Sequence, residues 1–176
     1  MAEIPYQIIF QLLQTAGILV GVFYYVTTLR NQSRARKMSV ANQLGQVMSS
    51  VENMNIFMEL LEMEWDDFDD FQRKYDSAVN RDNYAKRFMF WGLFDRIGCE
   101  LYRGNVDAEM LCSQTTFQGV WLHWNKFKPI ILEYRERYGW PDFMRWSEYL
   151  VDELTKARVK QGLPPGFLDP DEYTTT

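Results

Sequence analysis

The sequence has few of the residues from which most active sites are built. Its 176 residues include one histidine, His123, and two cysteines, Cys99 and Cys112. One histidine cannot form a multi-histidine metal site, and the two cysteines lack the C-x-x-C spacing of metal and redox motifs. No glycine-rich phosphate loop precedes a predicted helix. We therefore predict a protein that is not an enzyme and that binds no cofactor or metal.

Charged residues are absent from the 22 residues between Ile8 and Leu29. At about 1.5 Å per helical residue this stretch is about 33 Å long, enough to span a hydrocarbon core of roughly 30 Å. A cleaved signal peptide would start with basic residues and end at a small-x-small site, whereas this chain starts MAEIPYQ. We predict an uncleaved transmembrane helix, with residues 1–29 forming a short outer tail and this helix.

Four basic residues follow the apolar stretch within residues 30–37, namely Arg30, Arg34, Arg36 and Lys37. By the positive-inside rule they place the N-terminus outside and the remaining chain in the cytoplasm, in a single-pass protein of the cell (inner) membrane. The same cations would contact anionic lipid headgroups. Acidic residues prevail further on, and the formal net charge is −5. We therefore expect membrane lipids as partners and no nucleic acid.

Amide and small side chains interrupt the apolar stretch. Spacings of three, four or seven place on one helical face Gln7, Gln11, Gln14, Gly17, Gly21 and Thr28. An amide facing lipid is unsatisfied, whereas an amide facing a helix can exchange hydrogen bonds, and G-x-x-x-G lets two backbones approach. We predict a helix interface formed by Gln11, Gln14, Gly17 and Gly21, although G-x-x-x-G also occurs by chance and outer glutamines can simply meet headgroups. The partner is another copy or a different subunit.

Helical periodicity recurs through residues 38–162, and no run of alternating β-branched residues indicates a strand. We expect an all-α fold, in which a cytosolic bundle of about five helices follows the transmembrane helix and residues 163–176 form a mobile tail. The first expected helix covers residues 38–63 and can form one rod with the span, and the second covers residues 82–103 and stops at Gly104. A short helix follows through Leu111. The next helix starts near Ser113 or Thr115, and Pro129 bends or ends it. The last helix runs from about Asp142 to Gly162.

Several polar groups of this domain have a structural and a functional interpretation. In EWDDFDDF (residues 64–71) the calcium-loop pattern is missing, so we favour a helix start or turn whose aromatic residues face inward and whose acids face water. Asp95 and Glu100 are the best candidates for partly buried carboxylates, with Arg96, Arg103 or Arg135 as counter-ions. We expect these two acids to be ion-paired or exposed and not catalytic. We expect His123 to be a satisfied core or edge imidazole and the two cysteines to be free, buried thiols.

The segments AKRFMFWGLFDRIGCELYRGNVDAEML and VWLHWNKFKPIILEYRERYGWPDF resemble the cytosolic part of small single-span bacterial membrane proteins known only as a domain of unknown function. The shared pattern is an apolar helix with an acid, a glycine turn, a short acidic helix and a tryptophan-bearing helix that ends in arginines. The resemblance implies architecture and topology and provides no catalytic residues.

Two hypotheses for the function follow. In the first, the chain is a non-enzymatic membrane protein that acts as an assembly or accessory subunit through helix packing, in a homo-oligomer or a larger membrane complex. In the second, it is a membrane-tethered sensor or effector whose helical domain binds a small ligand between Trp91, Trp121 and Trp124. Tryptophan at helical spacing is more often part of a core.

Overall fold

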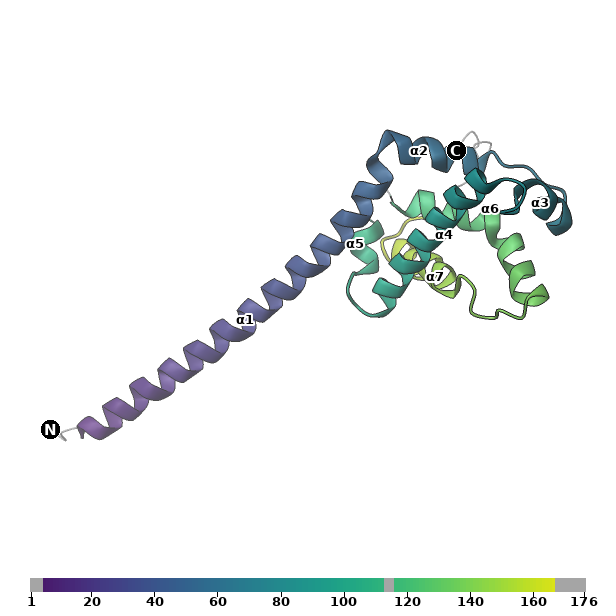
Figure 1. Cartoon of the computed structure of the whole chain (residues 1–176). Coiled ribbons are helices and arrows are strands. Elements are labelled where there is room, and N and C mark those ends of the chain that lie inside the picture. Colours follow the sequence, from purple (N-terminus) through teal and green to yellow (C-terminus); the bar gives the residue numbers. More distant parts are fainter. Residues whose placement is uncertain (1–4, 113–115, 167–176) are drawn as a thin grey trace. The chain divides into compact units, whose positions relative to one another are not determined.

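The computed structural model describes residues 5–112 and 116–166, without the side chains of residues 43, 44, 47, 48 and 116. These residues form seven α-helices and no strand, which confirms the all-α prediction (Figure 1). The helices are α1 (Tyr6–Ser49), α2 (Val51–Leu61), α3 (Phe68–Tyr75), α4 (Arg81–Tyr102), α5 (Ala108–Cys112), α6 (Thr116–Arg137) and α7 (Arg145–Lys160). Contacts divide the chain into two units, residues 1–39 and residues 40–176, which we call the N-terminal segment and the helical domain.

The helix expected over residues 38–63 is divided at Ser50. Ser50 has extended backbone dihedrals (φ −77°, ψ 137°), and its side chain accepts a hydrogen bond of 3.0 Å from the Asn53 backbone N–H. A serine in this role starts a new helix, because it satisfies one of the amide donors that a helix N-terminus leaves free. Residues 38–49 therefore belong to α1, and α2 begins at Val51.

The core of the helical domain is aromatic and is built around α4. Phe90, Trp91, Phe94 and Ile97 are almost completely buried, and α4 contacts α2, α3 and α7. Gly98 allows the closest of these approaches, since a Cβ at this position would overlap the carbonyl group of Trp146 in α7. The expectation of a central apolar helix between residues 82 and 103 is confirmed.

Glycine ends α4 as the sequence predicts. Gly104 has a φ of +73°, the left-handed conformation that glycine adopts without strain, and the Asn105 N–H donates to the Glu100 carbonyl at 2.9 Å. Gly162, with a φ of +75°, follows α7 in the same way. Both positions confirm that glycine sets these helix ends.

Pro129 does not end a helix, because α6 continues through it to Arg137. The residues that follow Pro129 explain why: Ile130, Ile131 and Tyr134 are all buried, and their packing offsets the backbone hydrogen bond that proline removes. The predicted start of this helix near Ser113 or Thr115 lies outside the described residues.

The chain after α7 is described only as far as residue 166. The Arg158 side chain donates a hydrogen bond of 3.1 Å to the Pro164 carbonyl, and Gly166 lies against Trp121. Residues 163–166 therefore contact the helical domain. The rest of the tail predicted over residues 163–176 lies outside the described residues.

Candidate membrane-spanning segment and helix interface

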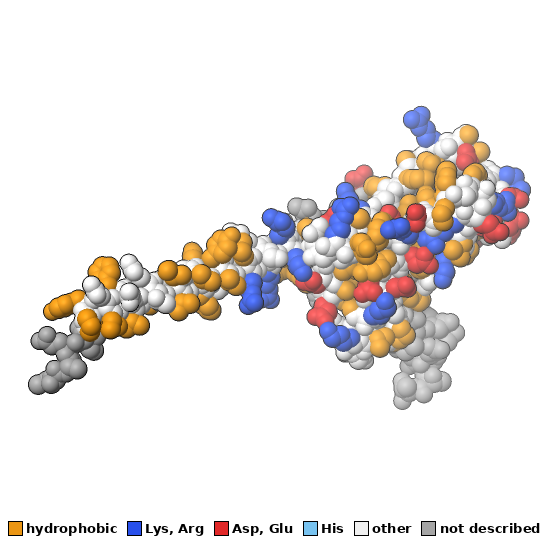
Figure 2. Space-filling view, turned by 90° about the horizontal axis from the view of Figure 1, so that it is seen from below, with side chains coloured by type: hydrophobic (Ala, Val, Ile, Leu, Met, Phe, Trp, Pro, Cys, Tyr) orange, Lys and Arg blue, Asp and Glu red, His pale blue; other side chains and the backbone are white. Residues whose placement is uncertain are grey.

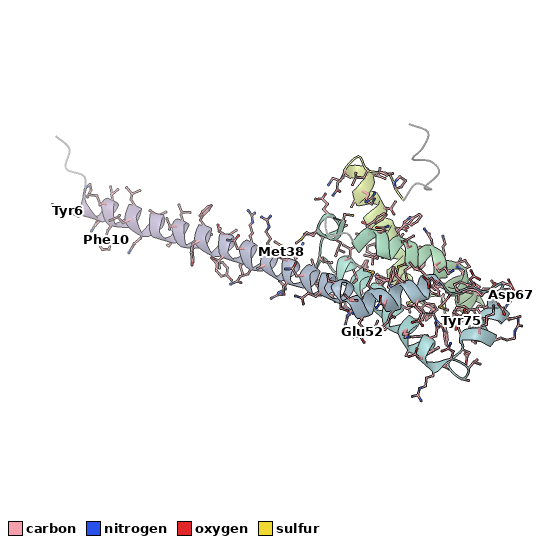
Figure 3. All side chains as sticks on the ribbon, turned by 90° about the horizontal axis from the view of Figure 1, so that it is seen from above. Tyr6, Phe10, Met38, Glu52, Asp67 and Tyr75 are labelled. Carbon is pink, nitrogen blue, oxygen red and sulfur yellow. The ribbon has the colours of Figure 1, made fainter. Side chains whose placement is uncertain are left out.

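Residues 6–29 of α1 carry a continuous series of exposed apolar side chains. Between Tyr6 and Leu29 the large apolar residues keep 41% to 89% of their surface accessible, and Figure 2 shows these side chains covering that part of the helix. Figure 3 shows Tyr6 and Phe10 pointing away from the helix into open space. Covering one such side chain stabilises a protein by about 1.5–3 kcal/mol, so this surface favours an apolar environment. The helix is long and apolar enough to span a membrane.

Two of the threonine hydroxyl groups in this stretch are satisfied within the helix. Thr15 donates to the Gln11 carbonyl and Thr27 donates to the Phe23 carbonyl, each at 2.8 Å. A hydroxyl that bonds the carbonyl four residues earlier needs no water, which suits it to a hydrocarbon environment. These two threonines therefore add little to the polarity of the surface of α1.

The four predicted interface residues lie on one face of α1 and have no partner there among the described residues. Apart from the adjoining backbone of α1 and the two neighbouring residues, no atom lies within 4 Å of a Cβ added to Gly17 or Gly21. The side chains of Gln11 and Gln14 are exposed, and no side-chain hydrogen bond joins either of them to another described residue. Each amide has two donors and one acceptor to satisfy, so this face combines open space with unmet hydrogen bonds.

The predicted headgroup residues follow directly along α1. Arg30, Arg34 and Arg36 are exposed and Lys37 is half-buried, and Figure 2 shows blue cationic side chains just beyond the apolar part of the helix. The sequence places no acidic residue between Glu3 and Glu52 to neutralise them within the helix. The segment thus changes from apolar to cationic within one or two helical turns.

In the helical domain, Asp95 is a helix cap and does not form the predicted ion pair. Its Oδ1 accepts hydrogen bonds from the backbone N–H groups of Trp146 and Ser147, at 3.0 and 3.1 Å. The residue before α7, Met144, has a φ of +54° and provides no side-chain cap, so Asp95 supplies from α4 the acceptor that α7 lacks. Burial raises the pKa of Asp95, and these two hydrogen bonds oppose that rise.

Glu100 makes the contact that was predicted for it, although weakly. Its carboxylate lies 3.8 Å from Arg103 and accepts a shorter hydrogen bond of 2.7 Å from the Asn105 side chain. Arg135, the third candidate counter-ion, donates to the Phe143 carbonyl and to Glu148. Asp95 and Glu100 therefore stabilise a helix start and a turn, and neither belongs to a group of potential metal ligands within the described residues.

Arg87 is a fully buried cation that the sequence analysis did not single out. Its guanidinium donates to Asn83 at 3.2 Å and to the Tyr75 carbonyl at 3.1 Å, and it lies 4.5 Å from the centre of the Phe71 ring. Burial lowers the pKa of Arg87. Its position four residues after Asn83 and three before Phe90 places it on the buried stripe of α4, and that periodicity is the signal by which it could have been found.

His123 is buried among aromatic rings, but it is not satisfied as predicted. Its Nε2 has no hydrogen-bond partner among the described residues, and the rings of Phe94 and Phe127 lie 4.9 and 4.8 Å from its own. Burial alone lowers its pKa to about 3. A neutral imidazole with no acid or metal ligand nearby acts here as an aromatic core residue.

The EWDDFDDF segment forms the start of α3, as expected, with one exception. Phe68 and Phe71 are buried and Asp66, Asp67 and Asp69 are exposed, but Asp70 is buried. Asp70 accepts from the Asp66 backbone and pairs with Lys74 at 2.7 Å, and the Lys74 bond lowers its pKa. Asp67, labelled in Figure 3, caps α3 by accepting from the Asp70 N–H. The prediction that all four aspartates face water is wrong at Asp70.

The tryptophans of the ligand-binding hypothesis are mostly core residues. Trp91 is 1% and Trp124 5% exposed, while Trp121 is half-buried. An open hollow of about 510 Å³ lies elsewhere, and it is lined by Glu64, Trp65, Asp66, Lys74, Asn125 and Lys126. None of the three tryptophans lines this hollow.

Neither a metal cluster nor a disulfide is found within residues 5–112 and 116–166. No group of three or more His, Cys, Asp or Glu side chains gathers there. Cys99 and Cys112 are free and half-buried, where the sequence analysis expected them to be free and buried. No family model matches the chain, and comparison with curated proteins and with solved structures finds no similar protein.

Proposed function

We propose that this chain is a non-enzymatic, single-span membrane protein that acts as an assembly or accessory subunit through packing of α1 in the membrane. The observation that carries the proposal is the exposed surface of α1, which joins a long apolar stretch to a face of unpaired amides and open glycines. A helix of this kind is stabilised by lipid over most of its surface and by another helix over the rest.

The cations after the span support an orientation for this protein. Arg30, Arg34, Arg36 and Lys37 follow the apolar stretch, and no lysine or arginine precedes it. Such an asymmetry favours a cytoplasmic location for the helical domain and an external N-terminus, in the cell (inner) membrane. The same four residues would contact the anionic headgroups of the inner leaflet, as proposed partners of this segment.

The interface is proposed at Gln11, Gln14, Gly17 and Gly21. Glycine at spacing four allows helix backbones to approach closely, and a glutamine amide gains hydrogen bonds from a neighbouring helix that lipid cannot provide. In model systems, such interhelical hydrogen bonds contribute about 0.6–2 kcal/mol each. A few of these contacts are enough to select a partner.

The test is the size of the assembly extracted with mild detergent from the protein's own membranes. We expect Gly17→Ile with Gly21→Ile, or Gln14→Leu, to shift the full-length protein to a smaller mass, because the added side chains separate the helices or remove the amide. Ala16→Ile is the matched control, since it adds similar bulk on the opposite face and should leave the mass unchanged. An unaltered mass for the interface variants would contradict the proposed function.

A further inference from the structure

Small or polar residues recur every seven positions along one row of α1, and this row continues beyond the apolar stretch. In coiled-coil notation the d positions are Gln7, Gln14, Gly21, Thr28 and Ala35, and the a positions are Gln11, Ile18, Tyr25, Gln32 and Ser39. All ten lie in the N-terminal segment, where every one of them is exposed except Thr28, which is half-buried. We call these two rows of residues the seam; Gly17, the remaining residue of the proposed interface, occupies the flanking g position beside Ile18.

The period of the seam differs from that of a straight helix. An α-helix has 3.6 residues per turn, so a seven-residue repeat drifts by about 20° per heptad unless two helices wind around each other with a left-handed twist. The seam keeps its register over 33 residues, from Gln7 to Ser39. Within it, the small or polar d residues from Gln7 to Ala35 recur at the spacing that a left-handed helix pair keeps in contact.

Most of the basic residues of α1 lie on the side of the helix away from the seam, so their charges do not keep two copies apart. Counting from the same heptads, Arg30 and Lys37 occupy f positions and Arg34 a c position, which lie farthest from a partner helix. Arg36 alone occupies a flanking e position. In a parallel pair the e position of one helix lies beside the preceding g position of the other, and that residue is Asn31, whose amide oxygen can accept from a guanidinium.

We propose that the partner of α1 is a second copy of this chain, packed parallel and in register along the seam as a left-handed helix pair. In this arrangement each glutamine of the seam meets the same glutamine of the other copy, and a carboxamide is self-complementary because it both donates and accepts. Small d residues at Gly21, Thr28 and Ala35 make room for Ile18 and Tyr25 at the a positions. The proposal rests on the proposed function and adds the identity, direction and register of the partner.

The repeat offers two matched pairs of positions for a disulfide test. Thr28 and Ser39 belong to the seam, whereas Thr27 and Ser33 lie about 100° to 120° away around the helix. In full-length protein with Cys99→Ser and Cys112→Ser, single Thr28→Cys and Ser39→Cys variants are oxidised in native membranes with copper phenanthroline. We expect covalent dimers to form at least tenfold faster at these positions than at Thr27→Cys and Ser33→Cys.

The outcomes separate this inference from the proposed function. Equal rates at seam and control positions, or no dimer at any of the four, would overturn the self-pairing. If the mass of the assembly still falls with Gly21→Ile while no dimer forms, α1 packs against a different protein, so the proposed function stands and this inference fails. If neither measurement responds, both fail.

Discussion

The glycines of the N-terminal segment and those of the helical domain occupy opposite environments. Gly98 lies where α4 meets α7, so closely that a Cβ would overlap the Trp146 carbonyl, whereas a Cβ at Gly17 or Gly21 would meet nothing. In the domain, α7 of the same chain occupies the space beside Gly98 that a side chain would take. In α1, no neighbouring element that the structure describes occupies the space beside Gly17 or Gly21. This open space beside Gly17 and Gly21 is the basis of our proposal that a helix of another chain packs there.

Polar groups show the same contrast. Asp95, Arg87 and Asp70 are partly or fully buried in the domain, and each is hydrogen-bonded to side chains or backbone of neighbouring residues and helices. Gln11 and Gln14 in α1 are exposed and make no side-chain hydrogen bond with another described residue. These three side chains of the domain have partners within it, although the buried Nε2 of His123 has none among the described residues, whereas neither Gln11 nor Gln14 uses its amide within the described chain.

The largest change in domain stability is expected when Gly98 of the helical domain is replaced by alanine, and the same substitution at Gly17 of α1 provides the comparison. Gly98→Ala should lower the free energy of unfolding of the domain by about 3 kcal/mol, because its new methyl group meets backbone that cannot rotate away. Gly17→Ala should leave that free energy unchanged. Urea unfolding of the full-length protein in detergent, followed by tryptophan fluorescence, measures both, and equal effects of the two substitutions would break the contrast.

A smaller effect is expected from acidification. The pKa of His123 is about 3 in the folded protein and about 6.5 when unfolded, so the unfolded chain binds the extra proton. Stability should therefore be full above pH 6.5 and fall by about 1.4 kcal/mol per pH unit below it, which is about 2 kcal/mol at pH 5.

The control for this pH dependence is His123→Phe, which keeps an aromatic ring and removes the titration. Its stability should be nearly constant between pH 6.5 and pH 5. The apolar stretch of α1 contains no carboxylate, histidine or other charged residue, so the assembly mass should not change either. Matching pH profiles for the wild type and His123→Phe would show that the imidazole is not held neutral by burial.

The smallest of the three effects concerns the helix cap. Asp95→Ala removes the acceptor for the Trp146 and Ser147 N–H groups and should cost about 1 kcal/mol of domain stability, while Asp95→Asn should cost less because an amide oxygen still accepts. Gln14→Ala, which removes an amide from α1, should leave the unfolding of the domain unchanged. An Asp95→Asn variant as unstable as Asp95→Ala would show that the charge, not the cap, matters.

The elements that the sequence predicts well are those set by local chemistry. The apolar length of residues 8–29, the glycine stops at Gly104 and Gly162 and the aromatic stripe of α4 all depend on residues close together in the chain. The features that escape prediction depend on distant contacts: Asp95 caps a helix that begins 50 positions later (145 − 95), and α6 passes Pro129 because the residues beyond it are buried. Arg87 was missed because a buried arginine without a carboxylate violates the usual rule for charges.

The predicted interface is a case of a different kind, since no neighbouring side chain or other element is described in the space beside Gly17 and Gly21. Spacing alone places Gln11, Gln14, Gly17 and Gly21 on one face, and the structure adds that this face is open. The seam continues the seven-residue spacing past residue 29. Polar residues are common in a helix outside a membrane, so composition alone does not distinguish these positions.

The most direct test of the central claim is the accessibility of α1 to water in sealed native membranes. In protein with Cys99→Ser and Cys112→Ser, a single cysteine replaces Ile9, Leu19, Val26 or Ser39. Each variant is treated with a maleimide that cannot cross membranes. The reagent is added to intact membranes, to opened membranes and after detergent. The account predicts that positions 19 and 26 react only after detergent, and that position 39 reacts once the cytoplasmic side is opened. Reaction of positions 19 and 26 in intact membranes, at the rate of an exposed cysteine, would contradict it.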